Sequence, residues 1–159
     1  MRLHPDRAGT VKSLETRERE FLGKDIALLY RASQKNLDDR LRPCGIGSGQ
    51  FYVLMPLFRE DGINQDAITR IIQVDKASVT RAVQKLVDEG YVVRKRDETD
   101  RRSCRVFLTK KGRGIQLAMT TIAQEWEDLL PSGFDPVERG GVRGSFETMI
   151  NTIFRDTGE

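Results

Sequence analysis

Five polar side chains with hydrogen-bonding chemistry lie close together in the sequence, at spacings that place them on one side of an α-helix. They are Ser78, Thr80, Arg81, Gln84 and Lys85. An arginine can donate two hydrogen bonds to guanine, and a glutamine can bond adenine in a similar bidentate way. Hydroxyl groups bond phosphates or base edges, and a lysine suits a phosphate as a point charge. The alternative is an ordinary solvated helix face.

A second group of cationic side chains surrounds and follows this helix in the sequence. Arg101 and Arg102 lie in a polar stretch between two apolar runs. They could enter a narrow minor groove, where the potential of DNA is most negative. Lys76, Arg94 and Arg96 are further candidates for contacts with DNA. Solvated loop charges would have the same appearance in the sequence, so both interpretations stay open at this point.

The positive charge of the chain is concentrated in the same region. The 159 residues have a net charge of only +3, but residues 70–113 contain 13 basic and 6 acidic residues. That segment therefore has a net charge of +7, which leaves −4 for the remainder. A basic segment in an otherwise acidic chain is typical of a surface that binds a polyanion.

The sequence contains little of the chemistry that enzymes and metal sites need. Its one histidine is His4, and its two cysteines, Cys44 and Cys104, are too far apart to form a metal-binding pair or a disulfide framework. The glycines of Gly45–Gly49 follow a helix and lack the lysine of a phosphate-binding loop. We therefore expect no enzymatic activity, catalytic residue, metal ion or cofactor.

The chain is of a size that one domain can have, and it resembles neither a membrane protein nor a secreted one. It has no apolar run near the roughly 20 residues that a membrane-spanning helix needs. Residues 1–20 lack the apolar core of a signal peptide. We expect a cytoplasmic protein.

Periodic apolar residues predict the elements that position the polar face. A helix from about Ser13 to Arg42 should end at Pro43, and Ser48 should cap a second helix that contains Pro56. Two short helices follow, capped by Asn64 and Asp75 and joined by a tight turn, with Gly90 after the second. The expected inward-facing residues of these two helices are Ala67, Ile68, Ile71, Ile72, Val79, Val83 and Leu86. Such a pair, with the second helix polar outside, is a helix-turn-helix.

The rest of the chain predicts a hairpin and two more helices. Residues 91–96 and 104–108 are alternating β-type runs joined by a charged tip. Thr109 should cap a fifth helix that ends near Leu130, and Asp135 precedes a sixth. The fold class is therefore mainly α with a small β-hairpin wing, an α+β arrangement. A helix-turn-helix followed by a basic hairpin is a winged helix-turn-helix.

The stretch Val74–Gly112 closely resembles the multiple antibiotic resistance regulator (MarR) family. The similarity lies in the S-x-T-R motif of the polar helix, the E-G-Y-V sequence at its end, and D-R-R followed by V-F-L-T in the hairpin. The order of the flanking helices also matches, so the resemblance covers almost the whole chain. It implies that Arg102 is a minor-groove arginine and that Asp100 holds it.

The resemblance further implies a homodimer that binds a palindromic operator in double-stranded DNA. The expected organisation is a flexible arm (1–12), a helical dimerisation region (13–47 and 110–159) and a winged helix-turn-helix lobe (48–109). The residues expected at the dimer interface are Leu22, Ile26, Leu29, Phe146, Met149, Ile150 and Ile153. Many members lose DNA affinity when a small aromatic or phenolic acid binds, so a ligand-released repressor is expected.

Two other functions remain open from the sequence. Some relatives switch by oxidising a cysteine, which makes Cys44 a candidate sensor, although it follows Pro43 rather than lying in the first helix. A winged helix could also act as a protein-binding adaptor without DNA. Cys104 alternates with apolar residues and is expected to be a small buried residue.

Overall fold

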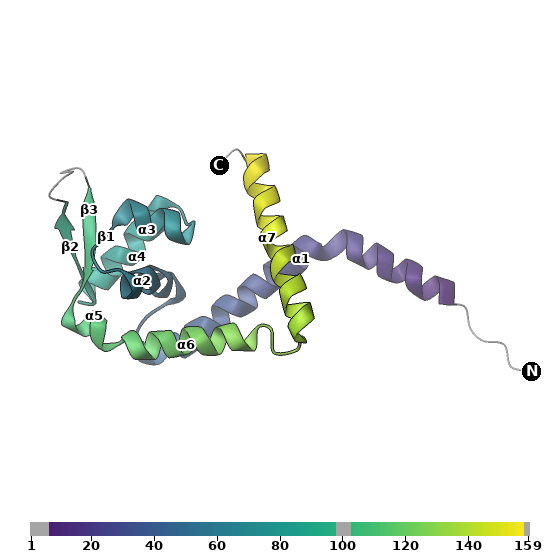
Figure 1. Ribbon diagram of the computed structural model, residues 1–159, viewed down its shortest axis with the longest axis horizontal. Helices are drawn as coiled ribbons and strands as arrows, with labels where there is room; N and C mark the ends of the chain where they lie inside the picture. The colour runs from purple at the N-terminus through teal and green to yellow at the C-terminus, as the bar shows by residue number, and fades with distance from the viewer. Residues whose placement is uncertain (1–6, 98–102, 158–159) are drawn as a thin grey trace, which may run out of the picture. The chain divides into compact units, whose positions relative to one another are not determined.

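The computed structural model describes residues 7–97 and 103–157, with side chains from residue 22 to residue 156 (Figure 1). The fold is mainly helical and contains a three-stranded antiparallel sheet, as the fold class predicted. The chain divides into two compact units, Met1–Arg113 and Gly114–Glu159. Among the residues described, every helix is too short or too polar to span a membrane.

The first helix, α1, spans Arg7–Leu41 and is followed by one turn of 3-10 helix, η1 (Arg42–Cys44). The helix ends just before Pro43, as predicted, because a proline pushes the preceding residue out of the helical region. The helix begins at Arg7 rather than at about Ser13, where we predicted its start. Adding residues to an existing helix costs much less than starting one.

The second helix, α2, spans Ser48–Arg59 and continues through the buried Pro56. The prediction that Ser48 caps this helix is wrong. The Ser48 N–H donates to Oδ1 of Asp38 at 2.7 Å, and the Gly47 N–H donates to Oε1 of Gln50 at 2.9 Å. These side-chain oxygens accept from N–H groups at the helix start that have no partner within the helix.

The helix-turn-helix consists of α3 (Gln65–Ile72) and α4 (Lys76–Asp88). Both predicted caps are confirmed. Oδ1 of Asn64 accepts from the Asp66 N–H and Oδ1 of Asp75 accepts from the Ser78 N–H, each at 2.8 Å. Between the helices, Gln73 has a φ of 52°, which reverses the chain direction within a few residues.

The inner faces of α3 and α4 supply much of the core of the first unit. Ile68, Val79, Val83 and Leu86 are buried as predicted, and Ala67 and Ile72 are partly buried. Ile71 is 58% exposed, which contradicts the prediction that it is buried. It lies in the last turn of α3, at the edge of the apolar stripe.

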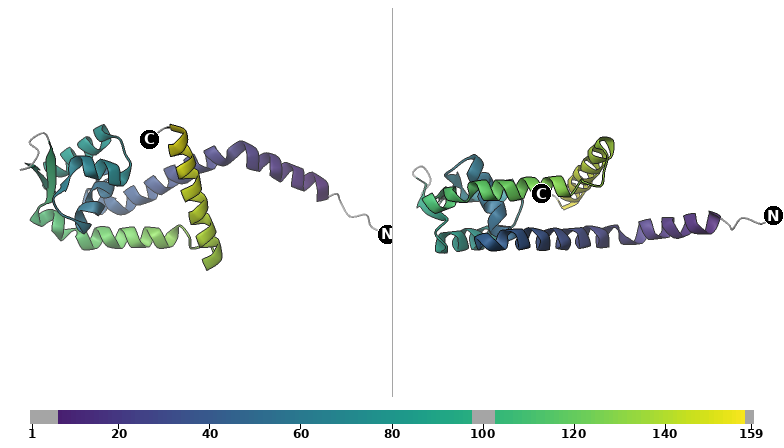
Figure 2. Two further views of the ribbon diagram at one scale, coloured as in Figure 1. Left: turned by 45° about the horizontal axis from the view of Figure 1, so that its top comes forward. Right: turned by 90° about the horizontal axis from the view of Figure 1, so that it is seen from below.

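The sheet has the strand order β1-β3-β2 and is antiparallel throughout. The predicted hairpin is formed by β2 (Val92–Arg96) and β3 (Cys104–Leu108), in a register that pairs Val92 with Leu108. We did not predict β1 (Ile63–Asn64), because two residues are too few to show alternation. Figure 2 shows α2, α3 and α4 grouped beside this sheet.

Two glycines let the chain pass closely around the end of α4. Gly90 has a φ of 75°, the left-handed conformation predicted for the residue after this helix. Gly112 lies against the backbone of Tyr91, where a Cβ atom would collide with the Tyr91 carbonyl oxygen. A side chain at position 112 would therefore displace the start of β2.

The predicted fifth helix is divided into α5 (Lys110–Gly114) and α6 (Gln116–Leu129). Thr109 caps α5, since its Oγ1 accepts from the Gly112 N–H at 3.0 Å. The interruption at Ile115 directly follows Gly112 and Gly114, and glycine weakens a helix relative to alanine.

The last helix, α7, spans Pro136–Thr157. Oδ1 of Asp135 accepts from the N–H groups of Val137 and Glu138, and Glu138 Oε2 accepts in return from the Asp135 N–H at 2.9 Å. This reciprocal capping agrees with the predicted helix start. The helix continues past Gly140, Gly141 and Gly144.

Candidate nucleic-acid interface

The polar face of α4 lies opposite its buried face. Thr80, Arg81, Gln84 and Lys85 are exposed, and Ser78 is half-buried. The inner face is fixed by Val79, Val83 and Leu86, none of which is more than 1% exposed. Because the two sets alternate along the same helix, burial of one set turns the other outward.

The first turn of α4 is fixed by Asp75. The side-chain and backbone hydrogen bonds from Ser78 lower the pKa of this carboxyl below its ordinary value. Ser78 also accepts from Nη2 of Arg81 through its hydroxyl oxygen, at 2.8 Å. The guanidinium group of Arg81 is therefore held near the N-terminal half of α4.

Gln84, in the middle of the polar face, is bonded on both sides of its amide group. Its Nε2 donates to Oδ1 of Asp88 at 2.7 Å, and its Oε1 accepts from Nη1 of Arg94 at 2.5 Å. Asp88 belongs to α4, whereas Arg94 belongs to strand β2. The side chain of Gln84 therefore joins the polar helix to the wing.

Arg94 makes more hydrogen bonds within the protein than its predicted role as a DNA contact suggests. Besides Gln84, its Nε donates to Oε1 of Gln65 at 3.2 Å and its Nη2 donates to the Thr80 carbonyl oxygen at 3.1 Å. Each of the three guanidinium nitrogens thus binds an acceptor of the chain. The structure gives Arg94 a bridging position between α3, α4 and β2.

Gln65 is a member of this surface that we did not predict. Its Nε2 donates to Oγ1 of Thr80 at 3.0 Å, and the same hydroxyl group donates to the Lys76 carbonyl oxygen at 2.8 Å. In the sequence, only the position of Gln65 directly after the cap residue Asn64 indicated that it lies at the start of α3, where it is half-buried. Its contact with α4 depends on how the two helices pack.

Lys76 is exposed at the start of α4, where a DNA contact was predicted. Its Nζ lies 2.8 Å from Oδ1 of Asp66 on α3, and both side chains are at least half exposed. An exposed ion pair of this kind contributes little to stability. The ammonium group can therefore exchange its partner for a phosphate at small cost.

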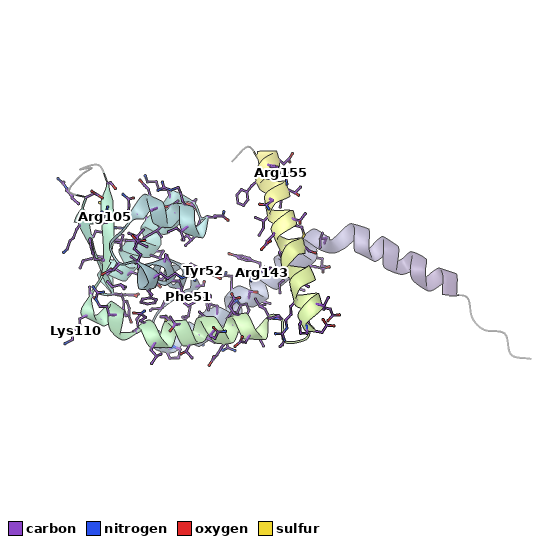
Figure 3. The ribbon with its side chains drawn as sticks, in the orientation of Figure 1. Phe51, Tyr52, Arg105, Lys110, Arg143 and Arg155 are labelled. Atoms are coloured by element: carbon purple, nitrogen blue, oxygen red, sulfur yellow. The ribbon has the colours of Figure 1, made fainter. Side chains whose placement is uncertain are left out.

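An ion pair joins Asp97, the residue directly after β2, to Arg105 of β3. Nε of Arg105 donates to Oδ2 of the buried Asp97 at 2.6 Å, and its Nη1 donates to the Gly62 carbonyl oxygen at 3.0 Å. Figure 3 labels Arg105 on the strand side of this unit. Arg96, a candidate for DNA contact, is exposed, whereas Asp100, Arg101 and Arg102 lie outside the described residues.

Comparison with known proteins identifies the family of this chain. The family model "MarR family" matches residues 46–104. The chain is also similar to a MarR transcriptional regulator of Methanosarcina mazei of known structure. The two are 50% identical, with a TM-score of 0.74, over 86% of this chain and 98% of that one. The chain belongs to the MarR family.

More distant relatives agree with this assignment. The transcriptional regulator SarZ of Staphylococcus epidermidis is 28% identical over 67% of this chain and 75% of its own. A MarR variant of E. coli, solved in complex with operator DNA, has a TM-score of 0.74 at 24% identity, over 83% of this chain and 95% of that one. The MarR family consists of winged helix-turn-helix transcriptional regulators, so this chain is a regulator and not an enzyme.

Most of the apolar residues predicted at the dimer interface of this MarR-family chain are exposed. Leu22 is 57% exposed on α1 and Ile150 is 46% exposed on α7. Ile26, Leu29, Phe146 and Ile153 are exposed as well, and Met149 is half-buried. Apolar side chains in such numbers on two helices are typical of an interface.

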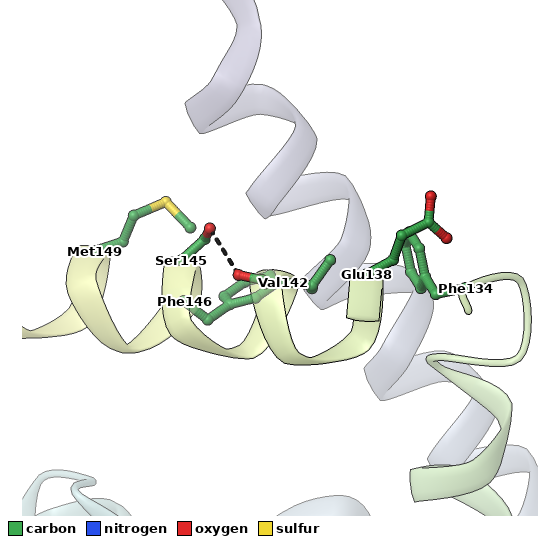
Figure 4. Close-up of a pocket in the computed structure, with 7 residues that line it drawn as sticks. Phe134, Glu138, Val142, Ser145, Phe146 and Met149 are labelled. Carbon is green, nitrogen blue, oxygen red and sulfur yellow. Dashed lines mark hydrogen bonds between the residues drawn. The ribbon is translucent and has the colours of Figure 1, made fainter. Parts of the chain in front are cut away.

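The last helix of this family member also carries an open apolar hollow of about 420 Å³ (Figure 4). Its lining includes Phe134, Val142, Phe146 and Met149. At its edge, the Ser145 hydroxyl donates to the Gly141 carbonyl oxygen at 2.9 Å, so this polar group is satisfied within the helix. Two of the lining residues, Phe146 and Met149, are among those predicted at the dimer interface.

Both cysteines are free and half-buried. The Cys44 carbonyl oxygen accepts a hydrogen bond from the Tyr91 hydroxyl group at 2.9 Å, which ties the end of η1 to the start of the wing. Cys104, predicted as buried, is only partly so, because it begins β3 beside a polar hollow lined by Lys76 and Arg94. Within the part of the chain described, no group of His, Cys, Asp and Glu could hold a metal ion.

Proposed function

We propose that this MarR-family chain binds double-stranded DNA as a homodimer at a palindromic operator. The observation that carries the proposal is the outward-facing polar surface of α4 beside a basic wing. With 13 residues, α4 is about 20 Å long, which suits a major groove about 12 Å wide. The wing would contact the neighbouring minor groove through Arg101 or Arg102.

Individual residues have distinct proposed roles. Arg81 reads guanine and Gln84 reads adenine, since their donor and acceptor patterns match those base edges. Ser78, Thr80, Lys76, Lys85 and Arg96 contact phosphates or base edges. Asp100 orients Arg102 by the family analogy. Phosphate contacts fix the register, and base contacts supply the specificity.

The dimer would be formed by the exposed apolar residues of α1 and α7. A two-fold axis places the two copies of α4 in successive major grooves, with half-sites about 34–36 Å apart. The symmetry of the protein is then matched by the symmetry of the operator. In this arrangement, residues 13–47 and 110–159 form the dimerisation region and residues 48–109 the DNA-binding lobe.

Regulation by a small molecule follows from the family resemblance. The chain would repress transcription in the cytoplasm until an aromatic or phenolic ligand lowers its affinity for DNA. Such a ligand can act only through a different affinity for the DNA-competent and DNA-incompetent states of the dimer.

Selection of duplexes from a random pool tests this function directly. The full chain should enrich an inverted repeat whose half-sites are about one helical turn apart. Failure to enrich any sequence would instead favour a protein-binding adaptor. If the selected duplex is released by peroxide in the wild type but not in Cys44→Ser, the regulator is a thiol switch rather than a ligand-released repressor.

A further inference from the structure

The amide group of Gln84 can have only one orientation in this structure. Its oxygen faces a guanidinium group of Arg94, and its nitrogen faces a carboxylate of Asp88. A guanidinium group only donates hydrogen bonds and an ionised carboxylate only accepts them. Turning the amide by 180° would place a donor against a donor and an acceptor against an acceptor. Arg94 and Asp88 therefore fix the positions of the amide oxygen and the amide nitrogen of Gln84.

The groups that remain free on Gln84 form a defined pattern. A glutamine amide has two N–H groups and two oxygen lone pairs, and each partner uses one. One donor and one acceptor remain on an exposed side chain. In the major groove, adenine offers an acceptor at N7 and a donor at N6, whereas guanine offers acceptors at N7 and O6. The free groups of Gln84 complement adenine and not guanine.

We propose that Arg94 and Asp88 are positioning residues that fix the Gln84 amide for an adenine in the operator. This inference rests on the proposed function and replaces the predicted role of Arg94 as a DNA contact. Arg94 suits the role because Gln65 and the Thr80 carbonyl oxygen hold its other nitrogens. The amide is thus oriented before DNA arrives, and little side-chain freedom is lost on binding.

Selections with variants of the full chain test the inference. In the wild type, the operator should contain one adenine per half-site whose preference disappears in Gln84→Ala. In Arg94→Met, the ratio of adenine to guanine at that position should fall at least about fivefold, as expected for the loss of one specific contact. Arg94→Lys should also lose the preference for adenine over guanine, because one ammonium group cannot replace three fixed guanidinium nitrogens.

Lys95→Met is the matched control for the change of charge. Lys95 lies next to Arg94 on the same strand, but its Nζ stacks over the Phe107 ring at 5.0 Å from the ring centre, outside the Gln84 network. The control should keep the wild-type ratio. Combining Gln84→Ala with Arg94→Met should change the ratio no more than Gln84→Ala alone, because the two residues act through one contact.

The outcomes separate the inference from the proposed function. Suppose that the wild type enriches an operator, but Arg94→Met and Arg94→Lys keep the wild-type ratio of adenine to guanine at the position that depends on Gln84. The inference is then wrong and the proposed function stands. The inference is also wrong if the base preference that disappears in Gln84→Ala is for a base other than adenine. If the wild type enriches no duplex, the proposed function fails and the inference fails with it.

Discussion

At the scale of single residues, the surface that we assign to DNA is held by side chains from three elements. Gln65 of α3 and Arg94 of β2 bond to Thr80 and Gln84 of α4. Arg81 donates a hydrogen bond to Ser78 of its own helix and interacts with the charge of Asp75 at the helix start. Among the bonds that the structure describes, none joins Arg81 to the wing. Arg81 should therefore contribute to DNA binding with little effect on folding.

Replacing Arg81 by alanine should weaken operator binding by about 1–3 kcal/mol and relax the preference at one base position. The cause is the loss of two hydrogen bonds to a guanine edge. Titrations with the selected duplex and with a duplex changed at that position measure both effects. Thermal unfolding should be nearly unchanged, because the side chain is exposed. A loss of affinity that is equal for all duplexes would contradict the assigned role.

The sequence predicted the members of this face better than the bonds between them. The spacing of Ser78, Thr80, Arg81 and Gln84 shows in the sequence, because helical periodicity is local. The position of Arg94 could not be predicted, since it depends on how β2 packs against α4. Strand alternation alone did not distinguish a residue that bonds to the helix from one that faces solvent.

At the scale of elements, Asp61, which lies between α2 and β1, is bonded to the last residue of β3 and to α5. Oδ1 of Asp61 accepts from the Leu108 N–H at 2.8 Å, and Oδ2 accepts from Nη2 of Arg113 at 2.7 Å. Partial burial by itself would raise the pKa of Asp61. The hydrogen bonds from Leu108, Arg113 and Gly62 outweigh that effect and lower the pKa below its ordinary value.

Acid should remove the stabilising effect of Asp61. Because its pKa is lower in the folded chain than in the unfolded one, its contribution is full above the unfolded pKa of about 4. The contribution is lost as the pH falls through the folded pKa. In urea unfolding, Asp61→Asn should therefore have a lower free energy of unfolding than the wild type at pH 7. This difference should become smaller at pH 3.

Asp39→Asn is the control for this measurement. Asp39 pairs with Arg42 on the surface, where an ion pair contributes little. This variant should unfold like the wild type at both pH values. If Asp61→Asn lowers the free energy of unfolding equally at both pH values, the charge of Asp61 has no role in stability.

Most elements could be predicted from local signals, and the exceptions have physical reasons. The caps Asn64, Asp75 and Thr109 and the left-handed Gly90 are where we expected them, because capping involves neighbours in the sequence. Strand β1 was not predicted, since it depends on pairing with β3. The division of α5 from α6 at Ile115 was not predicted either, although Gly112 and Gly114 indicate a weak helix there.

At the scale of the whole molecule, the proposed function requires a second copy of the chain. Exposed apolar residues on α1 and α7 would cost solubility in a monomer, and burying them provides a driving force for association. The grouping of these helices into one dimerisation region stays a prediction, because it concerns contacts that a single chain cannot make.

A charge placed on this apolar surface should separate the proposed dimer. Ile150→Glu would bury an unpaired carboxylate at the interface, which is costly, so the dissociation constant should rise at least tenfold. Sedimentation velocity over a range of concentrations measures it. The control is Thr152→Glu, at an exposed position two residues along α7, where a carboxylate should be tolerated. Equal association of both variants would place the interface elsewhere.

In the proposed function, the outer face of α4 and the wing bind DNA phosphates and bases. The most direct measurement is the salt dependence of binding to the selected duplex, for the wild type, Lys85→Ala and the control Lys35→Ala on α1. The affinity should fall steeply with salt, with a slope of about −0.9 for each phosphate contacted. Lys85→Ala should reduce the slope by about one, and Lys35→Ala should leave it unchanged. A flat salt response, or equal slopes for the two variants, would contradict the proposed function.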